Sequence, residues 1–166
     1  MLNTTDFKRG DDRYTDYITD SKLWGEMLKL DIFFEEKLGK TEETLAEALP
    51  AINSKLSFIE ENMDAVKRAS VDDAHLDELA EDWLSELLEH EDDTEVELED
   101  GSKIPVKVTP ERFIASLYPV ALGFEFNEST EICAAYLELC CDPDYFAGHR
   151  VHIEIDEENE ISCNGI

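Results

Sequence analysis

The sequence predicts one α+β domain spanning residues 1–166, in which an antiparallel sheet carries two to three helices on one face. Two observations support this prediction. In the middle of the chain apolar residues recur every three or four positions, as in an amphipathic helix, whereas before and after it they alternate with polar residues, as in a strand. The sheet is expected to combine a C-terminal four-strand meander with an N-terminal strand and a hairpin. A chain of 166 residues that is 42% hydrophobic can bury one core.

The N-terminal part of the chain predicts a polar lead-in followed by a strand. Residues 1–20 are mostly polar and are expected to be loosely ordered. The strand is predicted at residues 27–33, where apolar residues alternate with charged ones. Gly25 is expected to mark a bulge or the turn of a hairpin whose other strand lies at residues 14–18.

Two amphipathic segments predict the main helices. The first begins after Thr41, whose side chain can cap it, and Pro50 is expected to kink or break it near Leu49 because proline lacks a backbone N–H. The second is expected to begin at Ser70, with Asp73 in a capping-box-like position. The spacing of the first segment also fits a coiled-coil seam, but proline within about three repeats favours packing on the sheet. The apolar stripes are Leu45, Leu49, Ile52, Leu56, Ile59, Met63 and Val66 in the first segment, and Leu76, Leu79, Ala80, Trp83, Leu84, Leu87 and Leu88 in the second.

The second half of the chain predicts a ribbon, a short helix and the meander. The pair Asp100-Gly101 is expected to be the turn of a two-stranded ribbon, and Pro105 indicates an edge position for its second strand. Thr109 followed by Pro110 is typical of a helix start, and this helix can only be short. The meander strands are predicted at residues 118–126, 131–140, 149–156 and 160–164.

Charge is distributed very unevenly along the sequence. The chain has 42 acidic and 14 basic residues, and residues 69–102 contain fifteen Asp or Glu but no Lys or Arg. Such a surface repels nucleic acid and anionic membranes and attracts cations and basic proteins. The sequence therefore predicts an acidic face that binds a basic protein partner; the alternative is a solvated face that only keeps the protein soluble. The predicted acidic face consists of Asp77, Glu78, Glu81, Asp82, Glu86, Glu89, Asp92 and Asp93.

Few residues form a pattern typical of catalysis or metal binding. The sequence has no Gly-rich phosphate loop, no Gly-x-Ser-x-Gly elbow and no His-Glu-x-x-His motif, so no catalytic residue and no cofactor is predicted. The rival hypothesis is an enzyme or a metal-binding protein that uses His149, His152 and Glu154, of which only the last two share a strand face. His149 is alternatively a turn residue after Gly148, whose φ is then expected to be positive.

Cysteine usage and hydropathy predict a soluble, cytoplasmic protein. The four cysteines (Cys133, Cys140, Cys141 and Cys163) include no Cys-x-x-Cys pair and are expected to be free, buried thiols. The N-terminal residues lack the apolar core of a signal peptide, and no apolar run is long enough to cross a bilayer.

The last twenty-five residues resemble the ending of a known group of bacterial domains. Residues 146–149 (Phe-Ala-Gly-His) precede an alternating strand, an acidic turn and a last strand that reaches Gly165. This aromatic-x-Gly-His step before a final hairpin resembles the bacterial domains of unknown function DUF2262 and DUF2004. The Asp82-Trp83 step and the TPERFIASL helix entry are also similar, so the resemblance covers most of the chain. It implies no reaction and no catalytic residue. Small acidic domains of this type resemble proteins encoded near bacterial toxins, which implies an immunity or inhibitor role.

Overall fold

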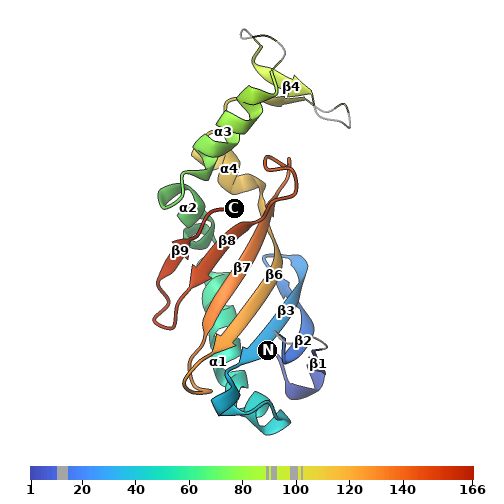
Figure 1. The fold of residues 1–166 in the computed structure, drawn as a ribbon, viewed down its shortest axis with the longest axis vertical. Coiled ribbons are helices and arrows are strands. Elements are labelled where there is room, and N and C mark those ends of the chain that lie inside the picture. The colour runs from blue at the N-terminus through green and yellow to red at the C-terminus, as the bar shows by residue number, and fades with distance from the viewer. Residues whose placement is uncertain (11–14, 89, 91–92, 98–100, 102) are drawn as a thin grey trace.

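The computed structural model describes residues 1–10, 15–88, 90, 93–97, 101 and 103–166 (Figure 1). These residues form an α+β fold around a seven-stranded sheet with the order β1-β2-β3-β6-β7-β8-β9. Neighbouring strands are antiparallel except for β3 and β6, which run parallel. The strands of this sheet are β1 (Lys8–Arg9), β2 (Tyr17–Leu23), β3 (Glu26–Phe34), β6 (Leu117–Phe126), β7 (Ala134–Cys141), β8 (Val151–Ile155) and β9 (Ile161–Cys163).

The four C-terminal strands do not form a sheet of their own. β6, β7, β8 and β9 are neighbours in chain order, and the parallel pair β3–β6 continues them into the three N-terminal strands. The predicted hairpin is present as β4 (Glu95–Glu97) and β5 (Lys103–Pro105), but it forms a separate two-stranded sheet. Its prediction as part of the main sheet is therefore wrong, because the alternating pattern shows which residues form strands and not which strands pair.

The N-terminal residues contribute more to the sheet than the sequence predicts. β1 and the start of β2 lie within residues 1–20, the expected lead-in, and the partner of β3 is the whole of β2. β2 is polar at its centre because it lies near the edge of the sheet, which hides its strand pattern. The turn prediction for Gly25 is confirmed: Trp24 and Gly25 have φ values of 51° and 89°, as in a tight two-residue hairpin turn.

Two of the four described helices cover one face of the sheet. α1 (Glu42–Glu61) and α2 (Met63–Asp72) lie behind the sheet in Figure 1, whereas α3 (Leu76–Glu86) and α4 (Pro110–Ser116) lie at one end. Two short 3-10 turns, η1 (Thr4–Asp6) and η2 (Glu36–Leu38), complete the described elements. None of the helices in the described part of the chain is long and apolar enough to cross a membrane.

Pro50 does not break its helix. α1 continues to Glu61, and the interruption comes at Asn62, where φ is −110° and ψ is 27°. Pro50 and Ala46, whose carbonyl loses its N–H partner, are both exposed, so water can replace the missing hydrogen bond. The cap of Thr41 is confirmed, since its side chain accepts a hydrogen bond from the N–H of Thr44.

Ser70 does not begin a helix either. It is fully buried inside α2, and its hydroxyl donates to the Lys67 carbonyl oxygen at 2.6 Å. α3 starts only after His75, whose φ of 50° turns the chain between the two helices. The predicted start of α4 is confirmed, because the Thr109 side chain accepts from the N–H of Arg112 and Pro110 is the first helical residue.

One lysine takes part in the packing of α1 on the sheet. The buried residues of α1 are Thr44, Leu45, Ala48, Ile52, Lys55 and Ile59, so the helix face is rotated slightly from the predicted stripe. Lys55 Nζ donates to the Asp156 carbonyl oxygen at 2.5 Å and to Asn159 Oδ1 at 2.7 Å. α1 therefore holds the turn between β8 and β9, and the buried ammonium has the partners that burial requires.

Candidate functional site

Three residues of the predicted acidic face form an exposed line on α3. Glu78, Asp82 and Glu86 are each exposed, and because they are four residues apart they lie on the same side of the helix. None of the ion pairs found among the described residues involves them. α3 extends beyond the end of the sheet (Figure 1), so this acidic line, defined as Glu78, Asp82 and Glu86, faces the solvent.

Other members of the predicted acidic face are placed differently. Asp77 is only 7% exposed and therefore lies on the packed side of α3. Glu81 is half-buried, and its Oε2 accepts a hydrogen bond from the Val108 N–H at 3.1 Å. Asp93 is exposed, and its carboxylate accepts a hydrogen bond from the His90 N–H. Glu89 and Asp92 lie outside the described residues.

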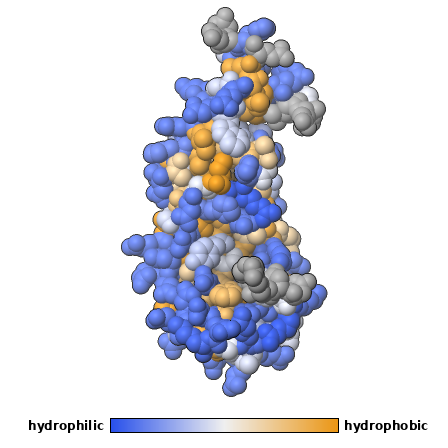
Figure 2. Space-filling view, viewed as in Figure 1, coloured by the Kyte–Doolittle hydropathy of each residue, from blue (hydrophilic) through white to orange (hydrophobic). Residues whose placement is uncertain are grey.

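A leucine follows the acidic line at the end of α3. Leu87 belongs to the predicted apolar stripe but is 60% exposed, whereas Leu84 is 2% exposed and packs in the core. Figure 2 shows apolar surface among polar residues at the end of the molecule that carries α3. The stripe prediction is wrong for Leu87, which is the C-cap of α3, whereas the next residue of the stripe, Leu88, is partly buried against the core. The end of α3 thus combines an unpaired acidic line with an accessible apolar side chain.

The residues of the rival hypothesis do not converge in a cluster. The His149 ring lies edge-on to Trp83 with centroids 6.0 Å apart, at the α3 end of the sheet. Glu154, on β8, accepts from Asn164 Nδ2 at 3.1 Å, and His152 is exposed two residues before it. Within the described ranges, no three His, Cys, Asp or Glu side chains are grouped so that they could hold a metal ion.

The turn before β8 is built as the sequence predicts. Gly148 has a φ of +85°, and the His149 N–H donates to the Phe146 carbonyl oxygen at 3.0 Å. Tyr145 and Phe146 are buried and pack with Phe113 and Trp83, so they close one end of the core. This turn is therefore a structural device that starts β8.

The cysteines have the properties of structural thiols. All four are free; Cys133 and Cys141 are buried, and Cys140 and Cys163 are half-buried. Burial raises the pKa of Cys133 and of Cys141 to about 12. A thiol with such a pKa is protonated at neutral pH, so neither residue is a nucleophile there.

A groove that the sequence does not predict lies on the face of the sheet opposite α1. Ala121 and Gly123 of β6 point to this face, whereas the intervening Leu122 is buried. The register places Asp31 on β3 and Tyr136 on β7 on either side of Gly123. Two contiguous hollows of about 390 and 420 Å³ follow β6 here, and both are lined by these three residues. The sequence holds one indication of this groove. Ala121 and Gly123 are small residues at alternate positions of β6, where the neighbouring strands carry longer side chains.

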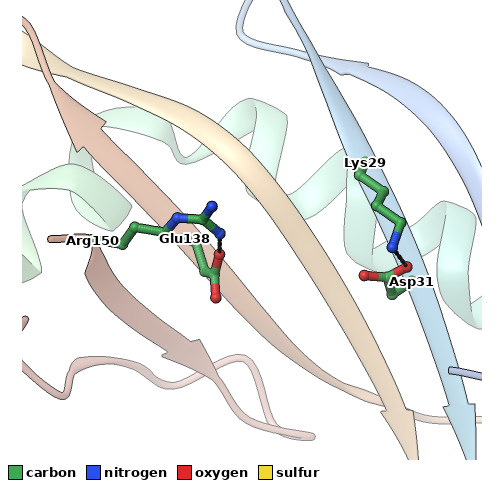
Figure 3. Close-up of polar contacts among 4 residues, drawn as sticks. All are labelled: Lys29, Asp31, Glu138 and Arg150. Atoms are coloured by element: carbon green, nitrogen blue, oxygen red, sulfur yellow. Dashed lines mark hydrogen bonds and ion pairs between the residues drawn. The ribbon is translucent and has the colours of Figure 1, made fainter. Parts of the chain in front are cut away.

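Charged side chains form the two walls of the groove. Lys29 Nζ lies 3.1 Å from Asp31 Oδ1 on one side of β6, and Arg150 binds Glu138 on the other, as Figure 3 shows. Tyr136 is 40% exposed, and burial together with Glu125, through its charge and a hydrogen bond, raises the tyrosine pKa to about 12. The groove therefore has a neutral phenol at its centre.

Comparisons with known proteins identify a family and nothing closer. The model of a family described as "Uncharacterized protein conserved in bacteria (DUF2262)" matches residues 11–166. No curated protein and no solved structure matches the sequence.

Proposed function

The chain belongs to the bacterial DUF2262 family of uncharacterized proteins, and we propose that it acts by binding a basic protein partner through the acidic line on α3. The observation that carries this proposal is the combination at the end of α3: three exposed carboxylates on one side of the helix, followed by Leu87 at 60% exposure. Exposed carboxylates alone keep a protein soluble, and an accessible leucine beside them adds apolar surface that a partner can bury.

The acidic line and Leu87 have different roles in the proposed complex. The acidic line lies in a part of the chain, residues 69–102, that has fifteen acidic residues and no Lys or Arg, so the charge of this segment attracts a cationic partner. Such charges raise the association rate and orient the partner, and salt screens them. Leu87 supplies an apolar contact that slows dissociation, since burying an apolar side chain on binding is favourable.

The partner class that suits this surface is a basic protein that the bacterium must hold inactive. An immunity- or inhibitor-like role needs only that the acidic line and Leu87 cover a basic functional surface of the partner. No reaction on this chain is required. The net charge of −28 supports fast capture of such a partner.

The proposal is tested by affinity capture followed by binding measurements on variants. The immobilised protein is exposed to an extract of the native bacterium, and proteins released by salt are identified. The dissociation constant of a captured basic protein is then measured with the triple variant Glu78→Gln, Asp82→Asn, Glu86→Gln and with Leu87→Ser. We expect about a tenfold or greater loss of affinity for the triple variant, mainly in the association rate, and faster dissociation for Leu87→Ser.

A matched control separates local from overall charge. The variant Glu43→Gln, Glu47→Gln, Glu61→Gln removes the same charge from exposed positions of α1. Its affinity is expected to stay close to that of the wild type. Equal losses in the two triple variants, or binding that does not change with salt, would contradict the proposal.

A further inference from the structure

The groove along β6 is the feature that the proposed function leaves unused. The register of the sheet places its side chains in three rows across the strands. The first row is Lys29, Ala121, Glu138 and His152; the second is Asp31, Gly123, Tyr136 and Glu154; the third is Phe33, Glu125 and Ala134. In the first two rows the β6 position carries almost no side chain. The bottom of the groove is therefore formed by β6 over these two rows, and its walls are formed by the longer side chains of β3 and β7.

The two ends of the groove differ in charge. At the end of the first row, Arg150 uses one terminal nitrogen for Glu138, which leaves most of its five N–H donors available. At the third row, Glu125 forms no ion pair with any described residue. Rows on one face are two residues apart, or about 7 Å along the strands. A cation beside the first row and the Glu125 carboxylate in the third row are thus about 14 Å apart along the strands, and Asp31 and Tyr136 lie between them in the second row.

The middle of the groove suits an apolar chain. The aromatic ring of Tyr136 stands beside Gly123, and Phe33 lies in the next row on the opposite wall. Asp31 Oδ1 is shielded from solvent, and no donor in the described residues meets it with hydrogen-bond geometry, although Lys29 Nζ is 3.1 Å away. The Asp31 side chain as a whole is 31% exposed, so the accessible part of its carboxylate remains available to a donor of a ligand above Gly123.

We infer that the groove binds a small elongated zwitterion, with its carboxylate on Arg150 and its ammonium group between Glu125, Tyr136 and Asp31. The guanidinium can hold a carboxylate through two parallel N–H donors. The chain between the two charged groups lies over Ala121 and Gly123, against the ring of Tyr136. A compact zwitterion such as glycine cannot reach both ends. This inference is independent of the proposed function, because it uses no residue of α3.

Ligand-observed NMR and calorimetry at physiological salt test the inference with four probes. 6-Aminohexanoate carries both charges on a chain that spans the rows, glycine carries both on a short chain, and hexanoate and hexylamine each carry one. We expect 6-aminohexanoate to bind at least tenfold more tightly than the other three. Hexylamine also reports non-specific attraction of cations to this acidic protein. If hexylamine binds as well as 6-aminohexanoate, or if no probe binds the wild type, the inference is wrong.

Gly123→Val blocks the groove without changing charge. A Cβ at Gly123 would meet only the Tyr136 carbonyl oxygen, at 3.9 Å, and the glycine φ is not in the left-handed region, so the variant should fold. Ala121→Val is a second blocking variant. Both are expected to lose 6-aminohexanoate binding, and Glu125→Gln and Arg150→Gln to weaken it at least fivefold. Wild-type affinity in either folded blocking variant would overturn the inference.

The triple variant of the acidic line is the control for location. Glu78→Gln, Asp82→Asn, Glu86→Gln should bind 6-aminohexanoate as the wild type does, while Gly123→Val should keep the basic partner. Loss of zwitterion binding in the acidic-line variant would show that overall charge, and not the groove, holds the ligand, and would overturn the inference. The two proposals therefore fail separately.

Discussion

The Glu81 carboxylate accepts a hydrogen bond from the Val108 N–H at 3.1 Å, and this contact joins α3 to the segment that leads into α4. We expect Glu81→Ala to lower the free energy of unfolding by about 1–3 kcal/mol, because a partly buried N–H loses its acceptor. Glu78→Ala, on the exposed side of the same helix, should change it by less than about 0.5 kcal/mol. Urea unfolding measures both. If both variants change the free energy of unfolding by a similar amount, the contact between Glu81 and Val108 does not stabilise the protein.

The exposure of Leu87 predicts that it is dispensable for stability. Leu87→Ser should leave the free energy of unfolding within about 0.5 kcal/mol of the wild type, since the side chain is 60% exposed. Leu84→Ala, three residues earlier and 2% exposed, should cost about 2–5 kcal/mol. Thermal and urea unfolding of the pair check this. A large loss for Leu87→Ser would place that side chain in the core and remove it from the proposed interface.

Gly148 should be needed for its backbone conformation and not for space. Gly148→Ala is expected to cost about 1 kcal/mol, because φ is +85° and an alanine there is strained. Nothing lies within 4 Å of the added Cβ, so no clash contributes. Gly123→Ala, at a glycine without positive φ, is the control and should be nearly neutral or stabilising. The free energies of unfolding of both variants decide the point.

The buried thiols predict a loss of stability at alkaline pH. In the folded protein the pKa of Cys133 and of Cys141 is about 12, against an ordinary value of 9.0. Because the folded state keeps protons that the unfolded state releases, the stabilisation is complete below pH 9 and is lost as the pH rises toward 12. The loss is about 1–2 kcal/mol per thiol at pH 10.

Alanine variants isolate this contribution from other titrating groups. Urea unfolding is measured at pH 8 and pH 10 for the wild type, Cys133→Ala and Cys141→Ala. Each variant is expected to be less stable at pH 8 because of the cavity, but to lose less stability between the two pH values. If the stability of the variants depends on pH as that of the wild type does, these thiols ionise as readily in the folded protein as in the unfolded one.

The sequence predicts the elements of this fold better than their arrangement. The Thr109-Pro110 start of α4 and the positive φ of Gly148 follow from local chemistry, so both predictions are confirmed. The expected partner strand at residues 14–18 covers only the start of β2, whose polar centre reflects a position near the sheet edge. The pairing of β3 with β6 depends on residues far apart in the chain. Local patterns carry no information on such contacts.

The candidate site is likewise predictable from the sequence only in part. The charges of the acidic line are visible in the sequence, but the burial of Asp77 and the use of Glu81 depend on how α3 packs. The groove arises from three strands placed side by side, and only the small residues Ala121 and Gly123 hint at it in the sequence. Its charged walls, the pair Lys29–Asp31 and the pair Glu138–Arg150, come from segments more than a hundred residues apart and could not be brought together without the sheet register.

The parallel pair β3–β6 also sets the order in which the sheet can assemble. The chain between the two strands, from residue 35 to residue 116, forms all four described helices and the β4–β5 ribbon. Hairpins such as β2–β3 and β6–β7 close short loops, whereas joining β3 to β6 closes this long one at a greater cost in chain entropy. The two halves of the sheet are therefore expected to form first and to join late. Substitutions at paired residues such as Ile32 and Phe124 should then speed unfolding much more than they slow folding.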